Sequence, residues 1–199
     1  MIQIHLAVED ELSEKILKRL LVDSGRSFHV SSVINRGGFG YIKSKIEGLN
    51  KSAKGFPFLV LTDLDQHVCP SALIQNWLSK PLNANLMFRV AVREVEAWIL
   101  GDRENLSRFL GVSRDLIPID PETLADPKRT LVQLASKARK ADVRRRLVPK
   151  KNMTAIQGPE YNSCLSEFVG TAWNPLASAL VCPSLAKCCQ RIIEFTPTT

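Results

Sequence analysis

Along the first hundred residues, the pattern of apolar and polar positions switches repeatedly between two periods. Short runs of β-branched and apolar residues predict strands, and segments with apolar residues at helical spacing predict helices. The predicted strands cover residues 2–8, 28–34, 56–61 and 86–92. The predicted helices cover residues 13–22, 41–49, 70–78 and 94–100. Because strands and helices alternate, the pattern predicts βαβ units, and therefore an α/β fold with a parallel, Rossmann-like sheet flanked by helices.

Two of the predicted strands end in acidic residues. The first strand leads directly into Glu9, and the third leads into Thr62-Asp63-Leu64-Asp65. Ligands of an open parallel sheet bind outside the carboxyl ends of its strands. Since side chains alternate along a strand, Asp63 and Asp65 point the same way, and an adjacent first strand brings Glu9 toward them. Three such carboxylates repel one another unless a cation joins them, and oxygen ligands suit Mg²⁺ or Mn²⁺.

The character of the chain changes after Gly101, where prolines become frequent and no further strand pattern follows. We therefore predict an α/β domain over residues 1–101 and a helical, basic C-terminal extension over residues 102–199. The helices predicted in the extension cover residues 127–141, 158–170 and 183–195.

Composition narrows the class of protein. Hydrophobic residues make up 45% of the chain and charged residues 24%, which is typical of globular proteins and argues against a disordered or fibrous chain. No run approaches the roughly 20 apolar residues that span a bilayer, and acids stand near the N-terminus where a signal peptide needs an apolar core. We expect a cytoplasmic protein without membrane contact. Five cysteines without a C-x-x-C motif predict buried free thiols.

Positive charge is concentrated in one segment. The net charge is +7, and the segment from Lys128 to Lys151 carries ten Lys or Arg residues against one acid, Asp142. This bias favours contact with nucleic-acid phosphates, and a solvated helix face is the alternative. The residues predicted to bind nucleic acid are Arg139, Lys140, Arg144, Arg145 and Arg146.

The acidic motifs resemble those of a known group of domains. Val8-Glu9-Asp10, followed by Ser13-Glu14 and about fifty residues later by Leu61-Thr62-Asp63-Leu64-Asp65, is similar to the toprim pattern over roughly residues 1–100. Within that group the chain resembles small proteins related to the overcoming-lysogenization-defect nucleases. The segment Gly158-Pro159-Glu160-Tyr161-Asn162, with Trp173 and Pro183-Ser184-Leu185 downstream, is similar to the tail of one such subfamily.

The resemblance implies a fold, an activity and partners. In toprim proteins the glutamate acts as general acid or base or as a metal ligand, and the two aspartates hold Mg²⁺ or Mn²⁺, which implies these roles for Glu9, Asp63 and Asp65. The family's usual Glu-Gly is Glu9-Asp10 here, and its second acid is displaced to Glu14, the candidate ligand of a second ion. Relatives are often encoded beside ABC-type ATPases in phage-defence operons, which implies such an ATPase as a partner.

Other polar residues are weaker candidates. Arg93, Glu94 and Glu96 follow the fourth predicted strand, where Glu96 is a further metal ligand and Arg93 and Glu94 take part in catalysis, or all three are surface charges. The glycine-rich segment 37–40 either cradles a phosphate or makes a tight connection. His67 either contacts phosphate or has no role.

Together with the acidic and basic residues, the resemblance implies a metal-dependent nuclease that acts on DNA or RNA, as the effector of an anti-phage system. The alternative is a non-catalytic toprim-like scaffold that binds an ATPase partner or nucleic acid.

Overall fold

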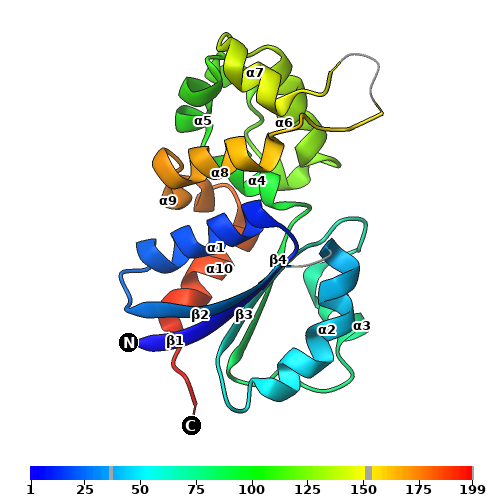
Figure 1. Cartoon of the computed structure of the whole chain (residues 1–199), viewed down its shortest axis with the longest axis vertical. Helices are drawn as coiled ribbons and strands as arrows, with labels where there is room; N and C mark the ends of the chain where they lie inside the picture. Colours follow the sequence, from blue (N-terminus) through cyan, green and yellow to red (C-terminus); the bar gives the residue numbers. More distant parts are fainter. Residues whose placement is uncertain (36–37, 151–153, 199) are drawn as a thin grey trace. The chain divides into compact units, whose positions relative to one another are not determined.

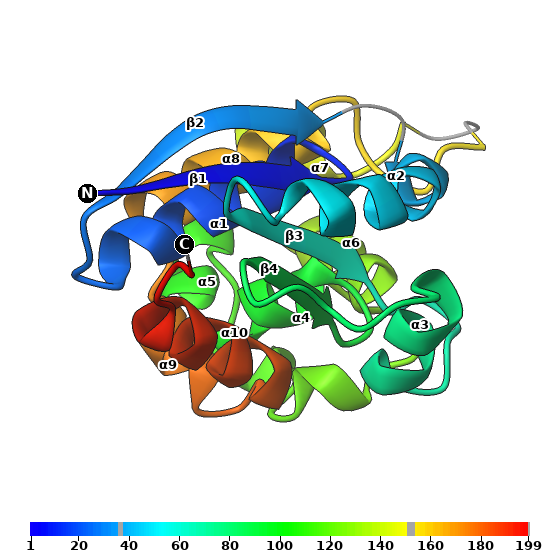
Figure 2. The ribbon, with the colours of Figure 1, turned by 90° about the horizontal axis from the view of Figure 1, so that it is seen from below.

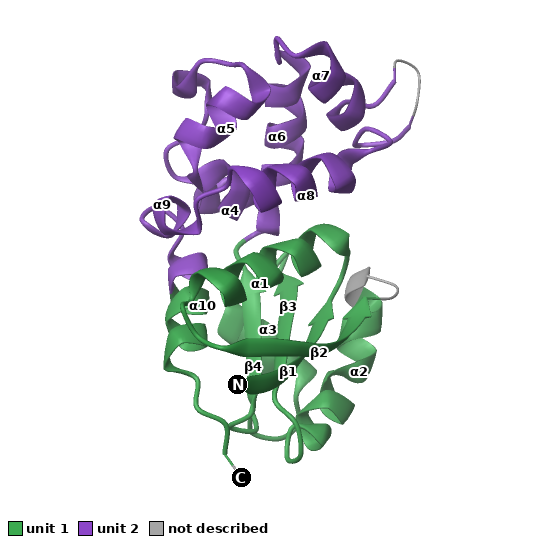
Figure 3. Ribbon diagram, turned by 60° about the vertical axis from the view of Figure 1, so that its left-hand side comes forward, with its two compact units in different colours: residues 1–92, 187–199 green, residues 93–186 purple. Residues whose placement is uncertain are grey.

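The computed structural model describes residues 1–35, 38–150 and 154–198 and divides the chain into two compact units. Unit 1 comprises Met1–Val92 and Lys187–Thr199, and unit 2 comprises Arg93–Ala186 (Figure 3). Unit 1 contains the sheet, whereas unit 2 is built from helices.

Unit 1 is a four-stranded parallel sheet with helices on both faces. Its strands are β1 (Ile2–Val8), β2 (Phe28–Asn35), β3 (Phe58–Asp63) and β4 (Leu86–Ala91). Its helices are α1 (Glu11–Asp23), α2 (Gly38–Ser52), α3 (Pro70–Trp77) and the part of α10 (Pro183–Glu194) from Lys187 onward. The strand order is β2-β1-β3-β4, and every neighbouring pair is parallel. Helices α1 and α10 cover one face, and α2 and α3 cover the other (Figures 1 and 2). The α/β fold with a parallel, Rossmann-like sheet is confirmed.

Local sequence explains the elements that frame the edge of the sheet. The Asp10 side chain caps α1 by accepting a hydrogen bond from the Ser13 N–H at 2.8 Å. Leu12, Ile16 and Leu17 lie on the buried side of that helix. Gly25 adopts the left-handed conformation, with φ +68°, just after α1 ends, as its position in the sequence predicts.

Strand β3 is buried on both faces because it lies in the middle of the sheet. Phe58, Leu59, Val60 and Leu61 are all at most 7% exposed, as expected for a strand covered by helices on both sides. The strand begins and ends two residues later than the sequence predicts. Phe56 is 59% exposed, so it lies outside the sheet. Asp63 is therefore the last residue of β3 and pairs with Ala91 of β4.

Unit 2 is a set of short helices around an aromatic core. Its helices are α4 (Val95–Gly101), α5 (Arg103–Leu110), α6 (Pro127–Ser136), α7 (Ala141–Leu147), α8 (Tyr161–Thr171), α9 (Pro175–Ala179) and the start of α10 (Pro183–Glu194), with 3₁₀ turns at Arg114–Leu116 and Pro121–Thr123. The indole N–H of Trp98 donates to the Ser184 hydroxyl at 2.7 Å, and that of Trp173 donates to the Ser178 hydroxyl at 2.9 Å. These bonds satisfy the polar atoms of a buried core.

The division between the units differs from the sequence prediction. The chain divides after Val92 rather than after Gly101, and residues 187–199 return to unit 1. Helix α4 is the reason. All seven of its residues are buried, and it packs against α6 and α9 of unit 2. An apolar helix that directly follows a strand is not distinguished by its sequence from a helix that packs on the sheet.

The predicted helix over residues 127–141 begins where α6 begins but is predicted to end too late, because α7 is a separate helix. Helix α6 ends at Ser136, and α7 starts at Ala141 after an extended Lys140. The Arg144 guanidinium donates to the Ala138 carbonyl at 2.8 Å, which satisfies a backbone acceptor in the connection. The sequence does not reveal the break between α6 and α7 because the connection contains neither Gly nor Pro.

The five cysteines are free thiols, as predicted. Cys164, Cys182 and Cys188 are buried, whereas Cys69 and Cys189 are partly exposed. Across residues 1–35, 38–150 and 154–198, no helix has both the length and the apolar character needed to cross a bilayer.

Candidate functional site

The predicted metal ligands Glu9, Asp63 and Asp65 lie where the two inner strands of unit 1 end. Strands β1 and β3 are neighbours in the sheet, with Leu6 opposite Leu59. The helix that follows β1 covers one face of the sheet, and the helix that follows β3 covers the other (Figure 1). The connections from the two strands therefore diverge at this edge. In open α/β sheets such a point is the usual place for a ligand.

Glu9 follows β1 and reaches across to the end of β3. Its Oε1 atom accepts a hydrogen bond from the Asp63 N–H at 2.9 Å and another from the Thr62 hydroxyl. Thr62 is only 1% exposed, so this anchor is fixed by the packing of the sheet. The carboxylate of Glu9 is thus held at the end of β3, and Oε2 takes part in neither of these bonds.

The pKa of Glu9 is raised above its ordinary value of 4.5. Burial is the largest cause, and the negative charges of Asp65 and Asp10 act in the same direction. The hydrogen bonds from Thr62 and Asp63 oppose them without cancelling the effect. A cation at this edge would favour the ionised form of Glu9.

Asp65 has an unusual backbone conformation. Its φ is +48°, and no other described residue except glycine has a positive φ. Aspartate tolerates this left-handed region better than most residues. On either side, the Leu64 N–H donates to the Ala91 carbonyl at 2.9 Å, and the His67 N–H donates to the Leu64 carbonyl at 3.0 Å. These bonds fix a tight turn directly after β3 and keep Asp65 at the edge that contains Glu9.

Glu14, the candidate ligand of a second ion, has partners of its own. It accepts hydrogen bonds from the Lys18 ammonium at 2.6 Å and from the Asn35 amide at 3.3 Å. Burial alone would raise the pKa of Glu14, but these hydrogen bonds lower it. Glu14 therefore ties α1 to the end of β2.

The chemistry of the donor set fits a hard divalent cation, although the side chains are not arranged as a complete site. Among the described residues, no three His, Cys, Asp or Glu side chains are grouped so that they could hold a metal ion. The residues that would hold one are Glu9, Asp63 and Asp65, whose carboxylates supply oxygen ligands only. Binding would require these side chains to turn toward a common point.

The three predicted residues after β4 belong to unit 2. Glu94 accepts a hydrogen bond from the Lys128 N–H at 2.9 Å. Glu96 is 2% exposed, accepts a hydrogen bond from the Tyr161 hydroxyl at 3.1 Å and lies 3.5 Å from the Lys128 ammonium. The structure thus places Glu94 and Glu96 in a network that joins α4, α6 and α8. Arg93 is the first residue of this unit.

Two partners in these networks were missed at the level of sequence. Thr62 lies inside the acidic motif, but its bond to Glu9 joins residues 53 positions apart. Tyr161 lies in the predicted tail motif and reaches Glu96 across 65 positions. Of the glycine-rich segment, Gly37 lies outside the described residues and Gly38 begins α2. His67 is partly exposed in the turn after Asp65.

Two groups of basic residues in unit 2 differ in their partners. Arg145 is paired with Asp142 and Glu160, at 2.8 and 3.1 Å. Arg146 is paired with Glu160 and Glu167, at 3.1 and 2.9 Å. The acids that pair with Arg145 and Arg146 come mainly from α8 and the residue before it. The ten-to-one ratio of basic to acidic residues in the segment therefore overstates how many of its cations lack an acidic partner.

The second group surrounds the connection between α6 and α7. Lys137, Arg139 and Lys140 are exposed and form no ion pair with any residue that the structure describes. The Lys140 ammonium lies 5.9 Å from the centre of the Phe109 ring. We call Lys137, Arg139 and Lys140 the basic loop. Lys151, the last residue of the basic segment, lies outside the described residues.

The Glu9 anchor leads to a prediction for the metal-free protein. Glutamine at position 9 retains Oε1 as an acceptor for Thr62 and Asp63 but removes a buried charge. Because the pKa of Glu9 is raised in the folded state, the wild type loses stability as the pH rises through that pKa. The advantage in melting temperature of Glu9→Gln over wild type in EDTA is therefore expected to grow as the pH rises above about 4.5. If the difference in melting temperature stays constant from pH 4 to 8, the ionised form of Glu9 does not destabilise the folded protein.

No protein-family model, no curated protein and no solved structure matches this chain.

Proposed function

We propose that unit 1 binds a divalent metal ion, Mg²⁺ or Mn²⁺, at the ends of β1 and β3 and hydrolyses phosphodiester bonds of a nucleic acid there. The observation that carries this proposal is the position of Glu9. Its carboxylate is anchored by Thr62 and Asp63, and the charge of Asp65 acts on it at the point where the connections from β1 and β3 diverge. Few structural roles require three carboxylates at one edge of a sheet.

The side chains at this edge have distinct tasks in such a reaction. Asp63 and Asp65 would hold the ion, which would activate an attacking water and stabilise charge on the leaving oxygen, with Glu9 either as a third ligand or as the base. Glu9 is also suited to accept a proton, because burial and neighbouring acids raise its pKa. The bonds from Thr62 and Asp63 keep its carboxylate oriented while a proton is held at Oε2.

The proposal is tested with the full chain and panels of single- and double-stranded DNA and RNA. Each substrate is incubated in Mg²⁺, Mn²⁺ or EDTA, alone and with an ABC-type ATPase encoded beside the gene, if one is present. We expect cleavage in a divalent cation and none in EDTA. Binding of Mn²⁺, measured by electron paramagnetic resonance, gives a readout independent of turnover. Absence of both cleavage and metal binding would rule the proposal out.

A non-catalytic scaffold is the second candidate. The engagement of Glu14 by Lys18 and Asn35, and the absence of a ready-made group of three ligands among the described residues, favour it. A scaffold would bind an ATPase or nucleic acid equally well in EDTA and in Mg²⁺, and replacement of Asp65 would leave that binding unchanged.

We further propose that the basic loop contacts phosphates of the substrate. Replacing Lys137, Arg139 and Lys140 together with Gln is expected to weaken nucleic-acid binding in EDTA by a similar factor for unrelated sequences. Each lost phosphate contact reduces the slope of log K against log salt by about 0.7–0.9, so three contacts would remove roughly 2–3 units. Fluorescence anisotropy over a salt series measures the slope.

The control for this experiment is Arg145→Gln with Arg146→Gln. These arginines are already paired with Asp142, Glu160 and Glu167, so their loss should lower stability and leave the slope nearly unchanged. An equal change of slope in both variants would indicate a general effect of net charge. No change in the triple variant would indicate that the basic loop is a solvated surface.

A further inference from the structure

Unit 1 has a polar hollow at the edge of its sheet opposite Glu9. It lies between the C-terminal part of α2 and the loop of residues 79–83, which precedes β4, and its volume is about 470 Å³. Pockets that bind small molecules commonly measure about 300–1,000 Å³. Its walls are formed by Glu47, Gly48, Asn50, Lys51, Lys54, Lys80, Pro81 and Asn83. We call this hollow the lysine pocket.

Side chains of α2 hold the loop wall of the lysine pocket in place. The Ser79 N–H donates to Glu47 Oε1 at 2.5 Å. The Asn50 amide donates to the Pro81 carbonyl at 3.0 Å, and its oxygen accepts from the Asn83 N–H at 2.8 Å. Asn50 is 7% exposed, so this clamp is shielded from water. The pocket therefore has a fixed shape before any ligand arrives.

The charge of the lysine pocket is positive. Lys51, Lys54 and Lys80 are exposed, and none forms an ion pair within the described part of the chain. Glu47 is the one acidic residue of the lining, and the Ser79 N–H, followed by Lys80, lowers its pKa. Lys51 lies in the last turn of α2, where the helix dipole alone favours a cation. Lys54 and Lys80 lie outside the helix, so the dipole does not explain the cluster.

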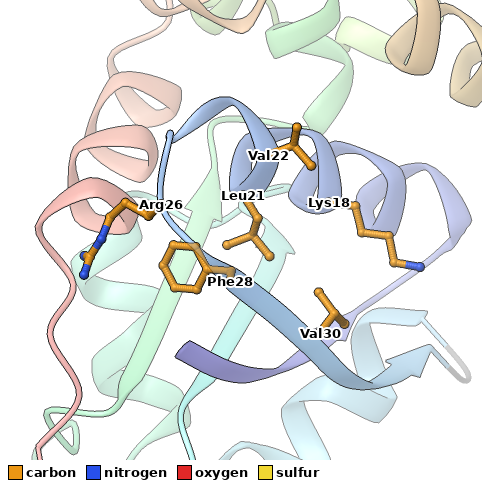
Figure 4. A pocket seen from close by; sticks show the side chains of 6 residues that line it. All are labelled: Lys18, Leu21, Val22, Arg26, Phe28 and Val30. Carbon is orange, nitrogen blue, oxygen red and sulfur yellow. The ribbon is translucent and has the colours of Figure 1, made fainter. Parts of the chain in front are cut away.

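Another hollow of unit 1 shows the contrast. Figure 4 shows the pocket between α1 and β2, with the apolar side chains of Leu21, Phe28 and Val30 along it. Its two cations are already engaged. Lys18 is paired with Glu14 at 2.6 Å, and Arg26 extends toward α10 and donates to the Ile193 carbonyl at 2.7 Å. The lysine pocket differs because none of its three lysines forms an ion pair within the described part of the chain.

Gly48 adds a second observation. It lies in the interior of α2, where glycine costs about 0.5–1 kcal/mol relative to alanine. Nothing lies within 4 Å of the position that a Cβ atom at residue 48 would occupy. Packing inside the protein therefore does not require glycine here, and its absent side chain keeps the wall of the lysine pocket open.

We propose that the lysine pocket binds a small phosphate-bearing molecule, with its phosphates on Lys51, Lys54 and Lys80. Ammonium groups attract phosphate strongly, and three of them suit a ligand with more than one phosphate. The clamped loop gives the site the fixed geometry that separates a binding site from a scatter of surface lysines. This proposal is independent of the metal site.

The test uses isothermal titration calorimetry of the full chain in EDTA, with inorganic phosphate, pyrophosphate and ATP as separate probes. We expect pyrophosphate and ATP to bind more tightly than phosphate. Replacing Lys51, Lys54 and Lys80 together with Gln should lower the affinity for pyrophosphate at least about tenfold, because charge-assisted hydrogen bonds are lost. Lys43→Gln changes an exposed lysine of the same helix outside the pocket and should have no effect.

Variants at Gly48 test the space independently of charge. Gly48→Leu should fill the pocket and abolish binding of ATP, whereas Gly48→Ala should retain binding and raise the melting temperature. Three results would overturn the proposal: no binding of any probe at millimolar concentration, equal affinity in the triple lysine variant and wild type, or binding of oligonucleotides alone.

Discussion

Replacing Asp65 or Asp63 with Asn is expected to abolish cleavage of nucleic acid, with a loss of at least about 100-fold. Even residues that only hydrogen-bond to metal ligands typically change metal affinity or activity by about 10–100-fold when they are mutated. Asn keeps the shape of the side chain and tolerates the left-handed conformation at position 65, where φ is +48°. The fold should therefore survive while the negative charge is lost. Cleavage rates and Mn²⁺ affinity are measured on the same preparations.

The matched control is Asp23→Asn, which removes a carboxylate of unit 1 at the far end of α1. Asp23 is paired only at the surface, with Arg19 at 2.7 Å, and such pairs contribute about 0–1 kcal/mol. The Asp23→Asn variant should cleave nucleic acid as fast as the wild type does. If Asp63→Asn and Asp65→Asn retain wild-type cleavage and metal affinity, the metal assignment is wrong. If the two variants lose metal binding but cleavage persists and varies between preparations, the cleavage comes from a contaminating nuclease.

The largest effect on stability is expected at Gly158. A Cβ atom there would lie 2.6 Å from the backbone carbon of Leu147 and still closer to the carbonyl oxygen of Arg146. Neither backbone atom is free to move, because the Gly158 N–H donates to the Leu147 carbonyl at 2.9 Å. Gly158→Ala should therefore destabilise unit 2 by about 1–3 kcal/mol or more, which is typical of overpacking. For a chain of this size, each kcal/mol lowers the melting temperature by roughly 2–4 °C.

Gly55→Ala is the comparison for this variant, because its nearest neighbour would be the Ser52 carbonyl oxygen at 3.8 Å. Its melting temperature should stay close to that of wild type. Circular dichroism during heating and denaturant titration measure both variants. An unchanged melting temperature for Gly158→Ala would show that residues 158–160, which precede α8, can shift away from α7.

Tertiary contacts changed the interpretation of the basic segment most. Its sequence contains one acid, Asp142, but Glu160 and Glu167 approach Arg145 and Arg146 from a helix that begins beyond the segment. Local charge counts include only neighbours along the chain, whereas ion pairs form between neighbours in space. The residues of the segment without an acidic partner therefore include those of the basic loop.

The sequence by itself determined the features that depend on local physics. The alternation of strands and helices, the Asp10 cap, the turn at Gly25 and the acids at the ends of β1 and β3 all follow from periodicity and from the preferences of single residues.

Only the tertiary structure decided which of these features meet. Thr62 bonds Glu9 across 53 positions, Tyr161 bonds Glu96 across 65, and the lysine pocket joins α2 to a loop about thirty residues further along. The packing of α4 within unit 2 likewise moved the division of the chain to Val92. Such contacts depend on the order of strands and on the direction in which each connection leaves the sheet, because side chains meet only after the backbone has closed the intervening loops.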